Sequence, residues 1–204
     1  MKVVDLGLIS YQEGLKQQSH YFSKKLKGDS ENYLLLLEHT PVFTFGKRDS
    51  SEDMLVKKEW LTAQGFDVVK TDRGGRVTYH APGQVVGYVI HKLSTSIPTF
   101  VSRVEEGVIQ TLKEYGISGK RDPEYPGVWV GHNKIAALGF RIEKGISRHG
   151  FSLNVNCDLS PYAYVNPCGI LNRGVTSFQK ELGKKAPEIK EVKKVLIQKF
   201  TDFR

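Results

Sequence analysis

GVWVGHNKIAALGFRI, residues 127–142, is the stretch that indicates the fold class of this chain. Its apolar runs, residues 128–130 and 134–142, flank the polar sequence Gly131-His132-Asn133, which is typical of the turn in a β-hairpin. A chain that combines hairpins with helices lacks the regular strand–helix–strand alternation of a parallel sheet. The stretch therefore predicts an α+β fold, in which helices pack on one mixed or antiparallel sheet.

The sequence on both sides of this hairpin contains further strand and helix patterns. Residues 33–37 form a short continuous apolar run, which is typical of a buried central strand. Ser10 and Glu13 match a capping box, so residues 11–27 are expected to form a helix that ends at Gly28. Other helices are expected at residues 56–64, 98–115 and 187–203, and other strands at residues 2–6, 42–45, 66–71, 85–90 and 150–155.

The composition of the 204 residues, with 39% hydrophobic and 25% charged, is typical of a globular protein and predicts a single domain over residues 1–204. The two cysteines, Cys157 and Cys168, provide no disulfide framework and favour a reducing compartment. No apolar run approaches the length of a membrane-spanning helix, about 20 residues, and the first residues do not match a signal peptide. We therefore expect a cytoplasmic protein that makes no membrane contact.

The formal net charge is +8. Residues 180–204 contain eight basic and four acidic residues, so half of that excess lies there. A basic surface favours an acidic partner, whether nucleic acid, an acidic protein or phosphate groups. A solvated helix face rich in lysine explains the charge of this segment equally well.

The loop RGGRVTYHAPGQ, residues 73–84, is the first candidate for chemistry. Its two consecutive glycines leave backbone N–H groups that can face a ligand oxygen, although neither a P-loop nor a dinucleotide fingerprint is present. Thr78, Tyr79 and His80 then place three different polar groups beside a Pro-Gly turn. Taken alone, the glycine pair is also typical of a hairpin or bulge, and His80 of a structural histidine.

Cys168 is the second candidate, because it lies between Pro167 and Gly169, which favour a bend that would present the thiol. Lys134 is normally a solvated strand end, but beside a thiol its amine would lower the thiol pKa and could pass a proton to a leaving group. The six histidines show no metal-ligand spacing, and no serine-nucleophile elbow is present. Nucleophilic acyl transfer by cysteine and lysine is the sharpest chemical interpretation, and a buried structural cysteine is the alternative.

Five stretches together resemble one family, the lipoyl(octanoyl) transferases of the LipB type. They are LLLLEHTPVFTFG (34–46), RGGRVTYHAPGQ (73–84), KIAALG (134–139), HGFSLNV (149–155) and DLSPYAYVNPCGI (158–170). Each motif is weak alone, but their shared order along most of the chain is specific. Two departures stand out, because Ala81 replaces the family's usual glycine and Arg76 stands where a smaller or acidic residue is common.

The resemblance implies a fold like the catalytic domain of biotin and lipoate protein ligases. It implies transfer of an octanoyl group from octanoyl-acyl carrier protein to a lysine of a lipoyl domain in a 2-oxoacid dehydrogenase E2 subunit, or of the glycine-cleavage H protein, without a cofactor or metal. The acyl-thioester role falls on Cys168 and the role of lowering its pKa on Lys134. Substrate contacts fall on Arg73, Gly74, Gly75, Arg76, Val77, Thr78, Tyr79, His80, Ala137, Leu138, Gly139, Gly150, Phe151 and Ser152.

Two alternatives stay open at the level of the sequence. An ATP-dependent lipoate or biotin protein ligase would share the fold but would not need Cys168. A basic RNA-binding module would explain the net charge, although the chain shows neither paired aromatic residues nor a Gly-x-x-Gly clamp of the kinds that contact RNA. Octanoyl transfer through Cys168 is the function we expect, with no nucleic-acid partner.

Overall fold

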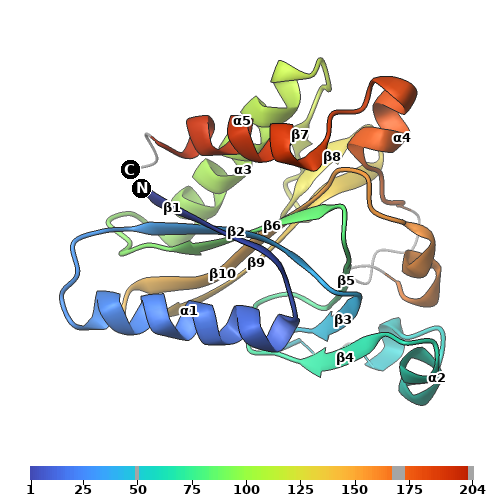
Figure 1. Ribbon diagram of the computed structural model, residues 1–204, viewed down its shortest axis with the longest axis horizontal. Helices are drawn as coiled ribbons and strands as arrows, with labels where there is room; N and C mark the ends of the chain where they lie inside the picture. Colours follow the sequence, from blue (N-terminus) through green and yellow to red (C-terminus); the bar gives the residue numbers. More distant parts are fainter. Residues whose placement is uncertain (49–50, 167–172, 202–204) are drawn as a thin grey trace.

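The computed structural model describes residues 1–48, 51–166 and 173–201, which form two β-sheets and their covering helices (Figure 1). Across the seven-stranded sheet the order is β1 (Lys2–Ile9), β2 (Tyr33–His39), β6 (Gln84–Ile90), β10 (Ile146–Asn154), β9 (Asn133–Glu143), β8 (Val128–Val130) and β7 (Lys120–Arg121). The three-stranded sheet has the order β4 (Asp67–Lys70), β3 (Val42–Phe45) and β5 (Val77–His80). The α-helices are α1 (Tyr11–Leu26), α2 (Lys58–Ala63), α3 (Ile97–Glu114), α4 (Phe178–Leu182) and α5 (Ile189–Thr201).

Strand pairing confirms the predicted α+β class. In the large sheet only β1 and β2 are parallel, and the other neighbours are antiparallel. The hairpin predicted from residues 127–142 is present as β8 and β9, and β9 forms a second, longer hairpin with β10. The expectation of a single sheet was wrong. The chain leaves the large sheet after His39, and β3 pairs instead with β4 and β5.

The leucine run of β2 explains why this strand is central. Leu34 and Leu36 face a cluster with α3 and α5, whereas Leu35 and Leu37 face a second cluster that contains Phe22 of α1. All four leucines are fully buried, and burial of each stabilises the fold by about 2 kcal/mol. Helices therefore cover both faces, with α3 and α5 on one side and α1 on the other (Figure 1).

Helix boundaries follow the predicted capping signals closely. The Ser10 hydroxyl accepts a hydrogen bond from the Glu13 N–H at 3.2 Å and begins α1. Ser96 caps α3 in the same way, with Pro98 in the first turn. The helix expected at residues 56–64 is shorter, and α5 begins at Ile189 rather than at residue 187.

Within the residues that the structure describes, none of the helices combines the length and the apolar character that crossing a membrane requires.

Candidate active site

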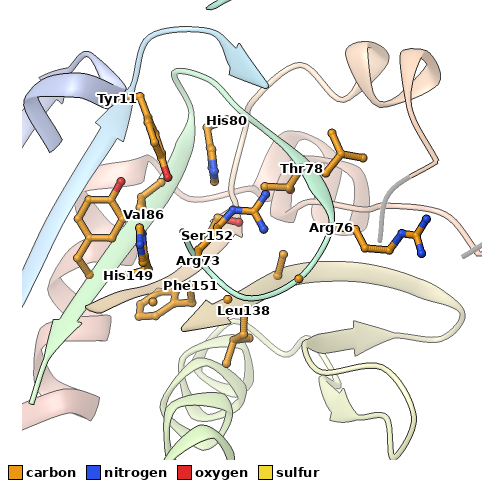
Figure 2. Close-up of a pocket in the computed structure, with 16 residues that line it drawn as sticks. Tyr11, Arg73, Arg76, Thr78, His80, Val86, Leu138, His149, Phe151 and Ser152 are labelled. Carbon is orange, nitrogen blue, oxygen red and sulfur yellow. The ribbon is translucent and has the colours of Figure 1, made fainter. Parts of the chain in front are cut away.

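A pocket lies where the two sheets meet (Figure 2). One side comes from β5 of the small sheet and from the glycine loop that precedes it, and the other from β6, β9 and β10 of the large sheet. Tyr11, the first residue of α1, lines the pocket beside His80. The site is therefore assembled from segments far apart in the sequence, and long-range strand pairing fixes their positions.

The pocket gathers all but two of the predicted substrate contacts. Those that line it are Arg73, Gly75, Arg76, Val77, Thr78, His80, Ala137, Leu138, Gly139, Gly150, Phe151 and Ser152. Gly74 does not line it, because its N–H donates to the Phe140 carbonyl at 3.0 Å and its Cα faces β9. Tyr79 does not line it either, because it packs with Phe43 and Tyr162 in the core of the small sheet.

Arg73 is the buried cation of this pocket. Its Nη2 donates to the Thr44 carbonyl at 2.6 Å and to the Thr44 hydroxyl at 2.9 Å, and Nη1 donates to the Gly74 carbonyl at 2.9 Å. Such a loop needs close backbone contact, and a Cβ on Gly46 would lie 2.2 Å from the Gly75 carbonyl oxygen. Small residues on both segments thus allow β3 to hold the guanidinium in place.

A chain of buried side chains fixes the state of His80. The Gln84 amide nitrogen donates to the Asn154 Oδ1 at 2.8 Å, so the Gln84 oxygen is the acceptor, and His80 donates to it through Nδ1 at 2.7 Å. Burial lowers the pKa of His80 to about 3. The ring is therefore neutral at neutral pH and has Nε2 as an acceptor, 3.4 Å from the Thr44 hydroxyl.

Four further residues line the pocket that the motifs did not assign to substrate: Tyr11, Val86, Tyr88 and His149. His149 is 2% exposed, its Nε2 lies 2.6 Å from Asp72, and burial lowers its pKa to about 4. The HGFSLNV motif begins with this histidine, so the sequence contained a signal for it. The sequence contained no such signal for Tyr11 and Tyr88, because the packing of α1 and β6 brings these residues to the pocket.

Lys134 lies in a second, smaller pocket that adjoins the first. Thr78, Ala137 and Ser152 line both pockets. The lysine side chain is 7% exposed, its Nζ donates to the Pro126 carbonyl at 3.2 Å, and it lies 4.8 Å from the centre of the Trp129 ring. The interpretation as a solvated strand end was therefore wrong for this residue, because β8 and the 126–127 turn enclose its amine.

Cys168 lies outside the described residues, and the structure describes the chain on both sides of it. The Asn166 N–H donates to the Asp53 carbonyl at 2.7 Å, and the Lys134 N–H donates to the Gly174 carbonyl at 2.9 Å. The other cysteine, Cys157, is buried beside the Asn154 side chain, and burial raises the pKa of its thiol to about 12. Cys157 is therefore protonated at neutral pH and is a poor nucleophile.

Residues 1–48, 51–166 and 173–201 contain no group of three or more His, Cys, Asp and Glu side chains that could hold a metal ion. The polar groups of the pocket are instead arginine, neutral histidines, hydroxyls and backbone amides. These groups can bind a carbonyl oxygen, and the apolar side chains of Val86, Leu138 and Phe151, which also line the pocket, can contact an apolar chain.

The family model for the lipoyl protein ligase A/B catalytic domain matches residues 10–201. An octanoyltransferase of Dictyoglomus thermophilum is 42% identical over 195 residues, which cover 96% of this chain and 84% of that protein. An octanoyltransferase of Caldicellulosiruptor saccharolyticus is 44% identical over 190 residues, which cover 91% and 81% of the two chains.

Solved structures of ligases share the fold. Lipoate-protein ligase A bound with ATP superposes with a TM-score of 0.76 at 19% identity, over 98% of this chain and 83% of that one. A biotin protein ligase of Aquifex aeolicus gives a TM-score of 0.55 at 13% identity, over 98% and 67%. At these identities the likeness concerns the fold, and it confirms the architecture expected from the sequence.

Proposed function

The chain belongs to the lipoyl protein ligase A/B catalytic-domain family and is an octanoyltransferase of protein lipoylation, and from that premise we propose that it works through an S-octanoyl thioester on Cys168. Octanoyl-acyl carrier protein is the donor in this proposal. The acceptors are lysines of lipoyl domains in E2 subunits and of the H protein. Lys134 assists both transfers, and the pocket of Figure 2, called the acyl pocket below, binds the acyl chain.

The observation that carries this proposal is the junction of the two pockets. Thr78, Ala137 and Ser152 line both the pocket that gathers the predicted substrate contacts and the one that contains Lys134. An acyl chain in the acyl pocket can therefore place its carbonyl carbon beside a buried amine. That arrangement supports a reaction centre at the junction and an apolar binding site beyond it.

In the first step the Cys168 thiolate attacks the carbonyl carbon of the donor thioester. The new C–S bond forms, the bond to the carrier thiol breaks, and the carrier thiolate receives a proton from the Lys134 ammonium. One thioester replaces another, so no ATP is required. A cation beside Cys168 also favours its thiolate form.

The edge of β9 supplies a donor for the developing oxyanion. Phe140 directs its carbonyl away from β10, because that oxygen accepts from the Gly74 N–H. In an antiparallel pair, N–H and C=O of one residue point to the same side and alternate along the strand. Leu138 therefore directs its N–H toward the glycine loop, where it can polarise a thioester carbonyl.

In the second step a neutral lysine amine of the acceptor attacks the S-octanoyl group. An amide bond forms, the C–S bond to Cys168 breaks, and the amine loses a proton. Lys134, neutral after the first step, can accept that proton, which returns both residues to their starting states. The net charge of +8 favours encounter with acidic carrier and acceptor domains.

The test is intact-mass measurement after incubation with octanoyl-acyl carrier protein in the absence of ATP. We expect a hydroxylamine-labile octanoyl adduct on the wild type, and its transfer when an apo lipoyl domain is added. Cys157→Ser is the matched control and should behave like the wild type, whereas Cys168→Ser should lose the labile adduct. Absence of transfer without ATP, with activity from free octanoate and ATP, would contradict the proposal and establish the ligase alternative.

A further inference from the structure

Two arginine–aspartate pairs lie on either side of the segment 167–172 that contains Cys168. On the N-terminal side, Arg76 of the pocket rim is paired with Asp53 at 2.5 Å, and the Asp53 side chain is 5% exposed. The Asp53 main-chain carbonyl also accepts the Asn166 N–H at 2.7 Å. One residue thus joins the acyl pocket to the chain that leads to Cys168.

The contact around Asp53 extends over several residues. Met54 and Val165 form an antiparallel β-bridge, and the Leu55 N–H donates to the Tyr164 carbonyl at 3.0 Å. Residues 53–55 and 164–166 therefore run side by side as a short two-stranded ribbon. The Arg76 side chain fixes the position of this ribbon relative to the glycine loop.

On the C-terminal side, Arg173 is paired with Asp122. Its guanidinium lies 4.8 Å from the centre of the Trp129 ring and 5.1 Å from that of Tyr125. The Lys134 amine also lies 4.8 Å from the Trp129 ring. The indole, 1% exposed, is thus a common contact for the proposed catalytic amine and for the first described residue after the segment.

We propose that the Arg76–Asp53 and Arg173–Asp122 pairs are positioning residues for acyl transfer, holding the two ends of the Cys168 segment against the acyl pocket and against the indole that contacts Lys134. This inference rests on the proposed function. The four side chains supply no chemical group to the reaction. Their effect is on the placement of the nucleophile, to which acyl transfer is sensitive.

The planar guanidinium suits this role. It binds a carboxylate with defined geometry and stacks on aromatic rings. A lysine ammonium lacks both of these properties, because it is a compact charge without a plane. Substrate contact is the role that the family motif implied for Arg76, and the ion pair gives it a second one.

The experiment measures single-turnover formation of the Cys168 thioester at increasing donor concentration. The variants are Arg76→Gln, Arg173→Gln, Asp122→Asn and the conservative Arg173→Lys. Glu114→Gln is the matched control, because it removes an ion pair of similar length, Lys199–Glu114 at 2.5 Å, that joins α3 and α5 away from the pocket. Thermal unfolding of every variant is measured in parallel.

We expect the maximal acylation rate to fall about tenfold to a hundredfold in the three variants that remove a pair. The half-saturating donor concentration should stay close to the wild-type value in Arg173→Gln and Asp122→Asn, whereas it should rise in Arg76→Gln, because Arg76 also lines the pocket. Arg76→Gln should lower the unfolding temperature, because it leaves the buried Asp53 carboxylate without this partner, and every variant should remain folded at the assay temperature. Arg173→Lys, which retains the charge but not the stacked plane, should be intermediate, and Glu114→Gln should match the wild type.

Two outcomes would overturn the inference while leaving the proposed function intact. In one, the wild type forms the thioester and the pair variants form it at the same rate. In the other, their rates fall only in proportion to a loss of folded protein, which would assign the pairs to stability. Failure of the wild type itself to form a thioester would instead contradict the proposed function.

Discussion

At the scale of single residues, burial separates Lys134 from a surface lysine and fits the catalytic role that we propose for its amine. The Pro126 carbonyl and the Trp129 face are its neighbours, and a Cβ on Gly127 would lie 3.1 Å from the Lys134 Cε. The side chain therefore passes through a space that only glycine leaves open. Its stem is fixed by packing, so its amine is presented in one position.

Replacement of this amine tests its role directly. Lys134→Met keeps the apolar stem and removes the charge, so we expect the rate of thioester formation to fall about 10²-fold to 10⁴-fold. Alkylation of the Cys168 thiol should require higher pH, because the cation that favours the thiolate is lost. Stability should fall by about 1–2 kcal/mol, because the hydrogen bond to the Pro126 carbonyl and the contact of the cation with the Trp129 ring are lost.

Lys180→Gln, a change at an exposed lysine, is the control and should alter none of these quantities. An unchanged alkylation profile in Lys134→Met would show that the amine does not act on Cys168.

The sequence identified most residues of the pocket through their motifs, and what it missed has a physical reason. Twelve of the fourteen predicted contacts meet in one pocket, because each motif is a strand end or a glycine loop whose partners are fixed by pairing. Tyr79 was included with its neighbours although a strand alternates its faces, and this residue faces the small-sheet core. Tyr11 and Tyr88 come from elements whose packing no local pattern specifies.

At the scale of elements, hairpins and helices were predictable because their signals are local. The turn between β8 and β9 and the caps of α1 and α3 require only neighbouring residues. The small sheet was not predicted, because parallel pairing of β3 with β4 joins strands separated by α2. Predicting such a pair requires knowledge of the tertiary arrangement, and this is why one sheet was expected and two are found.

The close approach of β6 and β10 is the element-scale feature that shapes one wall of the pocket. A Cβ on Gly150 would lie 1.9 Å from the Gly87 carbonyl oxygen and 3.2 Å from the Tyr88 Cα, so the added atom would meet backbone. Phe151 in turn occupies the space beside Gly87, where a Cβ would lie 2.4 Å from its ring. Because neither glycine has a side chain, the two strands can pair closely here and the Phe151 ring can pack against Gly87.

Gly150→Ala is therefore expected to lower the free energy of unfolding by about 3 kcal/mol, at the upper end of overpacking costs. Gly28→Ala is the comparison, because no atom lies within 4 Å of its Cβ and only the positive φ of 94° opposes the change, at about 1 kcal/mol. Urea unfolding of both variants measures the difference. Equal losses would mean that β10 shifts to accommodate the methyl group.

At the scale of the whole molecule, three buried histidines lie at the seam between the two sheets. His39, next to His80, lies 2.6 Å from the Tyr88 hydroxyl, and burial lowers its pKa to about 4. His80 and His149 have pKa values lowered to about 3 and about 4. Three histidines from three segments are thus neutral in the folded protein, and each would carry charge in a mildly acidic unfolded chain.

This arrangement predicts a loss of stability in mild acid. Above about pH 6.5 both states of each histidine are neutral, and below it the unfolded chain binds protons that the folded protein excludes. Stability should therefore fall as pH decreases from about 6.5 toward 4, at about 1.4 kcal/mol per pH unit for each proton involved.

Urea unfolding at several pH values measures this slope. His39→Gln removes one buried imidazole ring and should lower the slope by up to about 1.4 kcal/mol per pH unit, the contribution of one proton. His132→Gln, a change at an exposed site, should leave the slope unchanged. A wild-type stability that stays constant across this window would show that water or rearrangement lets the seam accept charge, and the pocket would then be more open in solution than its buried histidines indicate.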